Sequence, residues 1–157
     1  MGRIVKAAVM RSGSRKISTE VLIDSGADIT LLALADARLL GFDPCEAGKR
    51  SVIGGIGGQA TGVEFPVHIA IGEREATLVA LVILFSMTAK GKLVQKTRDR
   101  TLGGHDFLQA SKAKLDYSQP HDGVFSGAGS PFDWECRPAT KAEEKRMRKA
   151  LKCKRRR

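Results

Sequence analysis

The residues of this chain best suited to chemistry are Asp24, Ser25 and Gly26, which directly follow the apolar triplet Val-Leu-Ile at 21–23. A short apolar run rich in β-branched residues predicts a buried strand, and this strand would end at Asp24. A carboxylate at the end of a rigid strand, followed by a hydroxyl group and a glycine, can be held in one working position. Because Asp, Ser and Gly are also common turn residues, an ordinary surface turn is the alternative interpretation.

A second glycine-rich stretch lies at 52–58, where four glycines surround Ile56. Residues with high strand propensity flank it at 51–53 and 59–64, which predicts a hairpin whose backbone can lie close to another extended chain. A phosphate-binding loop is disfavoured, because the stretch lacks the Gly-Lys-Ser/Thr ending and no helix is predicted to follow it. A flexible loop without a ligand is the remaining alternative.

The sequence Asp-Ser-Gly-Ala-Asp at 24–28, after an apolar triplet, resembles the catalytic signature of the retropepsins, the retroviral-type aspartic proteases. In the same order along the chain, residues 52–58 resemble the flap of that family, and residues 102–108 resemble the segment before its C-terminal helix. The resemblance covers Ile4 to Ser118. It implies an all-β fold, a closed retropepsin-like barrel with one or two short helices.

The domain organisation expected from this resemblance has three parts. Residues 1–118 would form the protease domain, 119–140 an irregular extension rich in Gly and Pro, and 141–157 a basic tail that can be helical. Strands are predicted at 4–10, 16–23, 65–71 and 76–85, with short helices at 31–40 and 107–115 and a possible strand at 114–117. Residues 86–100 are predicted to form a solvated loop.

The activity that the resemblance implies is hydrolysis of peptide bonds by an aspartic endopeptidase. Such catalysis needs one ionised carboxylate to take a proton from water and one protonated carboxyl group to polarise the scissile carbonyl. The chain contains a single Asp-Ser/Thr-Gly sequence, so the second carboxylate must come from Asp24 of another copy. We therefore expect a homodimer with Asp24 from each protomer at its two-fold axis.

The resemblance also assigns roles to the neighbours of Asp24. Ser25 would brace the two active-site loops across the axis, and Gly26 would offer its backbone to the substrate. Ala27 stands where a hydroxyl donor to the carboxylate could be, which implies activity at milder acidity than in pepsin-like enzymes. Asp28 would be structural or hold peptide backbone, with a loop-capping acid as the alternative. The substrate-binding residues expected on these grounds are Ala27, Asp28, Ile53, Gly54, Gly55, Ile56 and Gly57.

Two features depart from the family pattern. His105 stands where many relatives have an Arg that pairs with the acid equivalent to Asp28, so we expect a weaker tie near pH 7. Only three residues precede the first strand at Ile4, so dimerisation would rest on the C-terminal strand and on residues 118–138. Asp106 is expected to be structural, as the N-cap of the following helix.

The positive charge of the chain belongs to its C-terminal end. The net charge is +10; residues 1–140 carry 17 Lys and Arg against 15 Asp and Glu, whereas residues 141–157 carry ten against two. Thr140 and Glu143 form a capping-box pattern that predicts a helix over 141–152. We expect a solvated, solubilising tail; weak, salt-dependent contact with nucleic acid is the sharper alternative, and attachment to anionic membranes is less favoured because the apolar stripe is thin.

The three cysteines, Cys45, Cys136 and Cys153, are scattered, and their odd number argues against a disulfide framework, so reduced surroundings are expected. The three histidines lie too far apart to suggest a metal site, and no cofactor is predicted. No apolar run approaches the roughly 20 residues of a membrane helix. The start of the chain lacks a secretory signal, so a cytoplasmic protein without a membrane span is expected.

Two alternatives to an enzymatic function remain open. One is a catalytically inactive module of the same fold that binds peptides or dimerises, and the other is a nucleic-acid-binding protein that acts through its basic tail.

Overall fold

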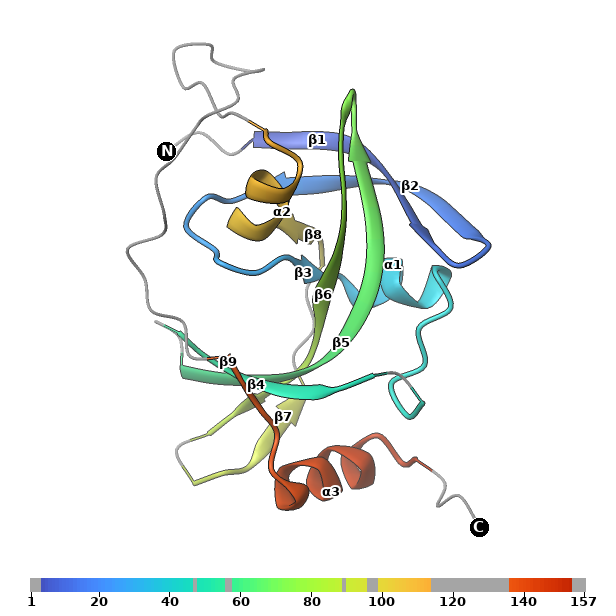
Figure 1. Ribbon diagram of the computed structural model, residues 1–157. Coiled ribbons are helices and arrows are strands. Elements are labelled where there is room, and N and C mark those ends of the chain that lie inside the picture. Colours follow the sequence, from blue (N-terminus) through green and yellow to red (C-terminus); the bar gives the residue numbers. More distant parts are fainter. Residues whose placement is uncertain are drawn as a thin grey trace.

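Six strands close into a barrel in the computed structural model, which describes residues 4–46, 48–55, 58–88, 90–95, 99–113 and 136–153. The strands follow one another in the order β6-β3-β8-β2-β1-β5, and pairing of β5 with β6 closes the ring (Figure 1). This confirms the predicted all-β barrel. The bounds of these strands are β1 (Ile4–Ser12), β2 (Arg15–Ile23), β3 (Leu31–Leu32), β5 (Gly58–Ile71), β6 (Arg74–Met87) and β8 (Thr101–Gly103).

The barrel is built on two long antiparallel hairpins, β1–β2 and β5–β6. Strand β8 then runs parallel to β2, so that Ile23 at the end of β2 lies opposite Gly103. The inward-facing side chains form one large apolar cluster, in which Phe42 and Phe65 meet edge to face with ring centroids 5.4 Å apart. Burial of this cluster is the main driving force for closing the barrel.

Three further strands extend the sheet beyond the barrel. Strand β4 (Arg50–Gly55) pairs with the first part of β5 to form the predicted glycine-rich hairpin. Strand β7 (Leu93–Gln95) pairs with the end of β6, so the prediction of a loop throughout 86–100 is wrong. Strand β9 (Cys136–Pro138) lies on the outer edge of β4, and the prediction that 118–138 is irregular is therefore wrong at its end.

The three helices within the described residues are short. Helix α1 (Leu34–Leu39) begins later than predicted because residues 31 and 32 join the sheet as β3, and it ends as predicted at Gly41, whose φ is +91°. Helix α2 (His105–Ala110) begins two residues earlier than predicted and ends at Ala110, so the prediction of a helix over 107–115 is wrong for residues 111–113. Helix α3 (Lys141–Ala150) has the predicted capping box between Thr140 and Glu143. The predicted strand at 114–117 lies outside the described residues.

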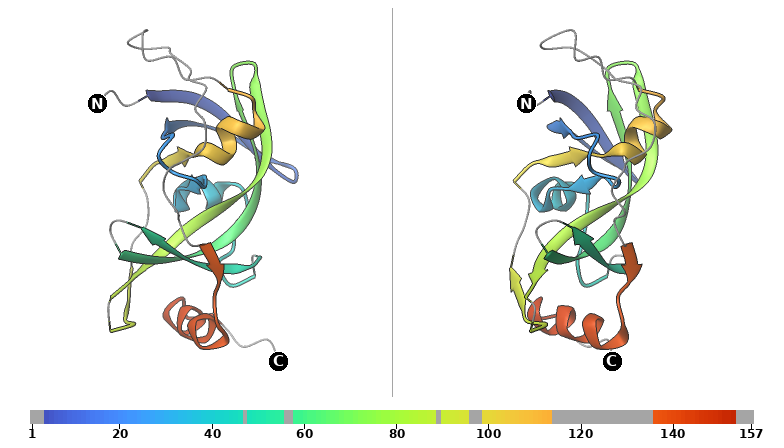
Figure 2. Two further views of the ribbon diagram at one scale, coloured as in Figure 1. Left: turned by 60° about the vertical axis from the view of Figure 1, so that its left-hand side comes forward. Right: turned by 90° about the vertical axis from the view of Figure 1, so that its left-hand side faces the viewer.

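The C-terminal helix is docked on the barrel rather than free (Figure 2). Met147 of α3 has no exposed surface and belongs to the main apolar cluster. The expectation of a solvated tail is therefore wrong for residues 141–153, because the helix has an apolar side that the barrel covers. None of the helices in the described part of the chain is long and apolar enough to cross a membrane.

A disulfide joins Cys45 to Cys153, whose Cα atoms lie 5.5 Å apart although 108 positions separate them in sequence. The expectation that the cysteines remain reduced is therefore wrong for this pair. The count of three cysteines was a poor guide, because docking of α3 brings together two that are remote in sequence.

Candidate active site

Asp24 lies at the first position after β2, as the sequence predicts. Its N–H donates to the carbonyl of Gly103 at 3.0 Å, so the pairing with β8 continues up to this residue. The Gly26 N–H donates to Asp24 Oδ1 at 2.9 Å, and the Ala27 N–H donates to the Asp24 carbonyl at 3.2 Å. The Asp24 carboxylate is exposed and has its orientation fixed by a backbone donor.

Gly26 sits close against this carboxylate. A Cβ atom at Gly26 would come within 3.2 Å of Asp24 Oδ1, which is tighter than ordinary van der Waals contact. A side chain here would push the carboxylate away from the amide that orients it. The structure thus gives Gly26 a positioning function that is visible within one chain.

The loop at 24–30 rests on the start of α2 through its backbone. The His105 N–H donates to the carbonyl of Ala27 at 2.6 Å, and the Asp106 N–H donates to the carbonyl of Asp28 at 3.1 Å. Gly104 makes this approach possible, because a Cβ atom there would lie 2.7 Å from the carbonyl oxygen of Ala27 and from Ile29. The segments at 24–30 and 104–106 therefore form one interlocked unit.

Thr30 is the centre of a buried hydrogen-bond network that the sequence analysis missed. Its side chain is fully buried, and its hydroxyl donates to Asp106 Oδ1 at 2.6 Å and accepts from the Gly104 N–H at 3.2 Å. Asp106 Oδ1 also accepts from the Phe107 N–H at 2.7 Å. The sequence offered one signal for this network, because Thr30 is a polar residue directly before the apolar pair Leu31 and Leu32. A polar side chain that is buried at such a position is hydrogen-bonded.

Asp106 is structural, as predicted, but it is not the N-cap. The N-cap of α2 is Gly104, without a side-chain cap, and Asp106 is the second residue of the helix. A weak tie between the side chains of His105 and Asp28 was expected. In the structure both residues use their backbone instead: the His105 N–H donates to Ala27, and the Asp28 carbonyl accepts from Asp106. Among the described residues no ion pair joins their side chains.

The glycine-rich hairpin β4–β5 projects to the same side of the barrel as the loop between β2 and β3 (Figure 1). Ile53 of β4 is buried in a second apolar cluster with Leu81 and Ile83 of β6, and Ile29 and Leu31 from the active-site side pack against it. Side chains of the hairpin and of the segment that follows Asp24 thus pack together in one apolar cluster. A Cβ atom at Gly54 would meet nothing within 4 Å, so β4 leaves open space at that position.

The other predicted hairpin residues can be followed only in part. Gly55 lies opposite Gly58 in the last pair of the hairpin, and Ile56 and Gly57 lie outside the described residues. The structure brings Ala27, Asp28 and Ile53 to the neighbourhood of the Asp24 turn through the contacts given above. No group of three or more His, Cys, Asp or Glu side chains within the described ranges could hold a metal ion.

The fold has a counterpart among solved structures. The EIAV protease, solved in complex with the inhibitor HBY-793, matches with a TM-score of 0.53 and 26% sequence identity, over 72% of this chain and 91% of that chain. No family model matches this sequence, and no curated protein does. The barrel is therefore retropepsin-like in fold, as the motifs predicted. The remaining 28% of this chain lies outside the match.

Proposed function

We propose that this chain is an aspartic endopeptidase that acts as a homodimer. The observation that carries the proposal is the Asp24 turn: an exposed carboxylate, fixed by the Gly26 amide, stands at the end of a barrel strand beside a glycine-rich hairpin. The same fold in the EIAV protease supports it.

In this mechanism the two Asp24 carboxylates, one from each protomer, share a proton. Close like charges disfavour double ionisation, so one carboxylate can take a proton from water while the other carboxyl group polarises the peptide carbonyl. The Gly26 N–H would hold Oδ1 of each carboxylate in place, and the backbone contacts of Ala27 and Asp28 with α2 would limit movement of the loop. Preorganised groups of this kind contribute without reorganising during the reaction.

The substrate in this proposal is an extended peptide with apolar side chains. The hairpin β4–β5 offers backbone for strand-like hydrogen bonds, since glycines leave it accessible. The partly buried side chains of Ile29, Leu31 and Ala60, which pack against the buried cluster of Ile53, Leu81 and Ile83, provide an apolar surface next to it. Apolar residues next to the cleaved bond would gain from burial against this surface.

The test is digestion of a diverse peptide mixture between pH 4 and 7 by the purified chain and by an Asp24→Asn variant. Glu73→Gln is the matched control, because Glu73 is an exposed acid in the turn between β5 and β6. We expect Asp24→Asn to lose activity by at least about a hundredfold, the lower range for a missing acid–base group, and Glu73→Gln to retain it. Equal product patterns from all three proteins, with dimers confirmed by sedimentation, would leave the inactive peptide-binding module as the better account.

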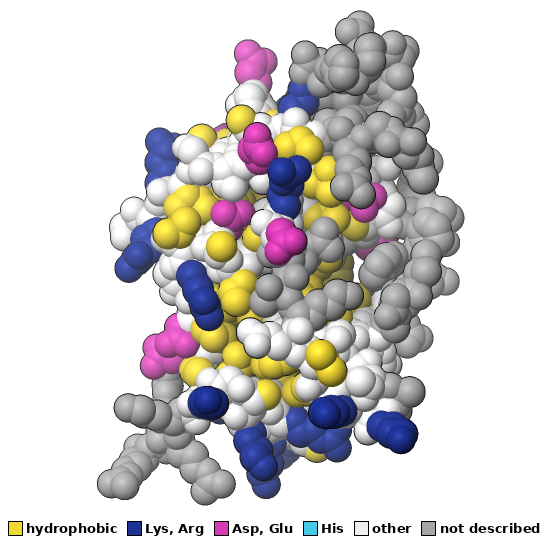
Figure 3. Space-filling model, turned by 180° about the vertical axis from the view of Figure 1, so that it is seen from behind, with side chains coloured by type: hydrophobic (Ala, Val, Ile, Leu, Met, Phe, Trp, Pro, Cys, Tyr) yellow, Lys and Arg dark blue, Asp and Glu magenta, His cyan; other side chains and the backbone are white. Residues whose placement is uncertain are grey.

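A second candidate function is binding of nucleic-acid phosphates through α3, and one observation favours it. Lys141, Lys145 and Lys149 recur every four residues and are all exposed, whereas Met147 faces the core and Glu144 is half-buried. Residues four apart lie on one face of a helix, about 6 Å apart along its axis. Figure 3 shows Lys and Arg side chains gathered at this end of the molecule.

Anisotropy of a labelled single-stranded oligonucleotide at increasing salt tests this second function. Changing the three lysines to Gln should weaken binding and lower the slope of log affinity against log salt by about 2, at roughly 0.7 per lost phosphate contact. The matched control changes the exposed cations Arg11, Lys16 and Arg74 to Gln. Equal losses in both variants, or binding that ignores salt, would contradict a site on α3, and preference for anionic vesicles would point to a membrane partner.

A further inference from the structure

Strand β9 covers the outer edge of β4, the first strand of the glycine-rich hairpin. The Ala139 N–H donates to the Arg50 carbonyl at 2.9 Å, and Val52 lies opposite Arg137 two residues further along β4. Backbone groups two residues apart in a strand point to the same side, so the Val52 N–H also points towards β9. Without β9, this side of β4 would be an unpaired sheet edge.

The covered strand also contributes to the second apolar cluster. Ile53 lies opposite Cys136 of β9 and packs with Leu81 and Ile83. Ile29 and Leu31 pack against the same cluster. The order of β4 is therefore linked both to the apolar cluster that Ile29 and Leu31 pack against and to the C-terminal segment.

Contacts of several kinds hold the C-terminal segment in this position. Met147 is fully buried, Leu151 packs against the same apolar cluster, and the Nη1 atom of Arg146 donates to the carbonyl of Gly91 at 3.2 Å. Two contacts converge on Cys45, which forms the disulfide with Cys153 and accepts at its carbonyl from Arg148 Nη1 at 3.0 Å. The disulfide fixes the far end of α3 to the loop that leads into β4.

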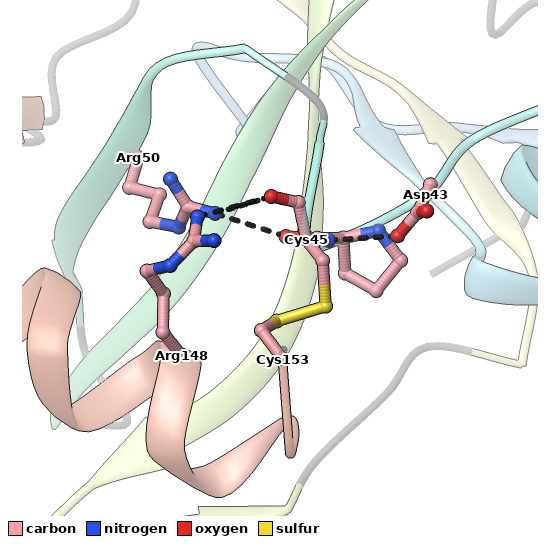
Figure 4. Close-up of a disulfide and its surroundings, with 6 residues drawn as sticks. Asp43, Cys45, Arg50, Arg148 and Cys153 are labelled. Atoms are coloured by element: carbon pink, nitrogen blue, oxygen red, sulfur yellow. Dashed lines mark hydrogen bonds between the residues drawn. A yellow bond between two sulfur atoms is a disulfide. The ribbon is translucent and has the colours of Figure 1, made fainter. Parts of the chain in front are cut away.

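Two arginine side chains, Arg50 and Arg148, meet next to the disulfide (Figure 4). Arg50, only 8% exposed, donates from Nη2 to the carbonyls of Pro44 at 3.1 Å and Cys45 at 3.4 Å, so its guanidinium lies beside that of Arg148. Burial, and next the charge of Arg148, lower the pKa of Arg50, while Glu144 acts in the opposite direction. Within the described residues Arg50 Nε is buried without a hydrogen-bond partner. The covalent bond thus holds together two like charges that would separate more easily without it.

We infer that the Cys45–Cys153 disulfide is a redox-sensitive latch that keeps β9 on β4 and thereby keeps the hairpin ordered for peptide binding. Both cysteines are half-buried, so a small thiol can reach them. In the opening step a dithiol gives up two electrons and two protons and becomes a disulfide; the Cys45–Cys153 bond breaks and both cysteines become thiols. The effect on peptide binding rests on the proposed peptidase function, whereas the structural effect on β4 does not.

Amide hydrogen exchange tests the latch without any need for activity. On complete reduction, confirmed by thiol titration, exchange at Val52 should rise about tenfold or more, because local opening no longer requires breaking the latch. Ser51, whose backbone groups point towards β5, should change less, and Val21 in β2 should change less than about twofold. Unchanged exchange at Val52 would contradict the latch, and an equal rise at Val21 would show that reduction loosens the whole barrel instead.

A variant pair separates the disulfide from other effects of the reductant. The double variant Cys45→Ser and Cys153→Ser should show the fast Val52 exchange without reductant and should not respond to it. Cys136→Ser leaves the disulfide intact and should behave as the unmodified chain does. A reductant response that persists in the double variant would assign the effect to another group and overturn the inference.

The functional consequence is read from a peptide cleaved in the digestion described above. Opening the latch should raise its KM several-fold and change kcat less, since a less ordered hairpin costs more to close over the peptide. If no peptide is cleaved in either redox state, the peptidase proposal fails while the exchange data still decide the latch. If cleavage occurs with the same KM in both states, the latch has no effect on the cleft, and that part of the inference is wrong.

Discussion

The loop at 24–30 and the C-terminal segment at 136–153 are both attached to the barrel sheet, but different kinds of contact hold them. The loop is tied to α2 and β8 by several short backbone hydrogen bonds and by the buried Thr30 hydroxyl. The contacts that hold the C-terminal segment include a three-residue strand, the buried Met147 with Leu151 beside it, arginine hydrogen bonds and a disulfide. The loop at 24–30 is therefore held by many local hydrogen bonds, whereas the attachment of the C-terminal segment includes a bond that reduction can break.

Removing the disulfide should have the largest effect on stability. For the double variant Cys45→Ser and Cys153→Ser we expect the free energy of unfolding to fall by about 4 kcal/mol, because the bond closes a long loop in the unfolded chain. Urea denaturation of oxidised protein and variant measures this. A loss below about 1 kcal/mol would mean that non-covalent contacts alone hold α3 in place. The C-terminal segment would then not depend on its disulfide, and it would not differ from the loop at 24–30 in that respect.

Gly104→Ala should have the second largest effect on stability, through the loop at 24–30. The new Cβ atom would lie 2.7 Å from the backbone of Ala27 and Ile29, so the loop must shift, at a cost of about 3 kcal/mol. Gly54→Ala is the matched control, because nothing lies within 4 Å of its Cβ position, and it should alter stability by less than about 1 kcal/mol. Similar unfolding midpoints for the two variants would show that the loop is more adaptable than the contacts imply.

Thr30→Val should have a smaller effect on stability, through the same loop. It keeps the shape of the side chain but removes a hydrogen bond to the Asp106 carboxylate and an acceptor for the Gly104 N–H, at a cost of about 2 kcal/mol. Thr77→Val changes a threonine on an exposed part of β6 and should stay within about 0.5 kcal/mol. Chemical denaturation compares them, and equal losses would argue against a special role for the buried network.

The barrel could be predicted from the resemblance to the retropepsins, and the strand and turn at Asp24 could be predicted because their signals are local. The triplet at 21–23, the turn after it and the glycines near 54 each impose a conformation on neighbouring residues. Strand β3 was absorbed into the helix predicted for 31–40, because two residues are too few to show a strand period. Thr30 gave only a weak signal, since its importance comes from a partner 76 positions away.

The C-terminal segment could not be predicted in the same way. Strand β9 is three residues long and pairs with β4 more than 80 positions earlier, so its own sequence does not specify its neighbour. Likewise, neither Cys45 nor Cys153 carries a spacing signal, and only the docking of α3 makes them adjacent. The capping box of α3 was visible because Thr140 and Glu143 are close in sequence.

The central claim, that two chains share one pair of carboxylates, is tested most directly by mixing the unmodified chain with the Asp24→Asn variant. The mixture is made where sedimentation shows both to be fully dimeric, and time is allowed for subunits to exchange. If each active site needs Asp24 from both chains, an equal amount of variant should halve the peptidase activity of a fixed amount of unmodified chain, since random pairing places half of it in mixed dimers. Activity that stays constant after exchange has been verified would contradict the shared site.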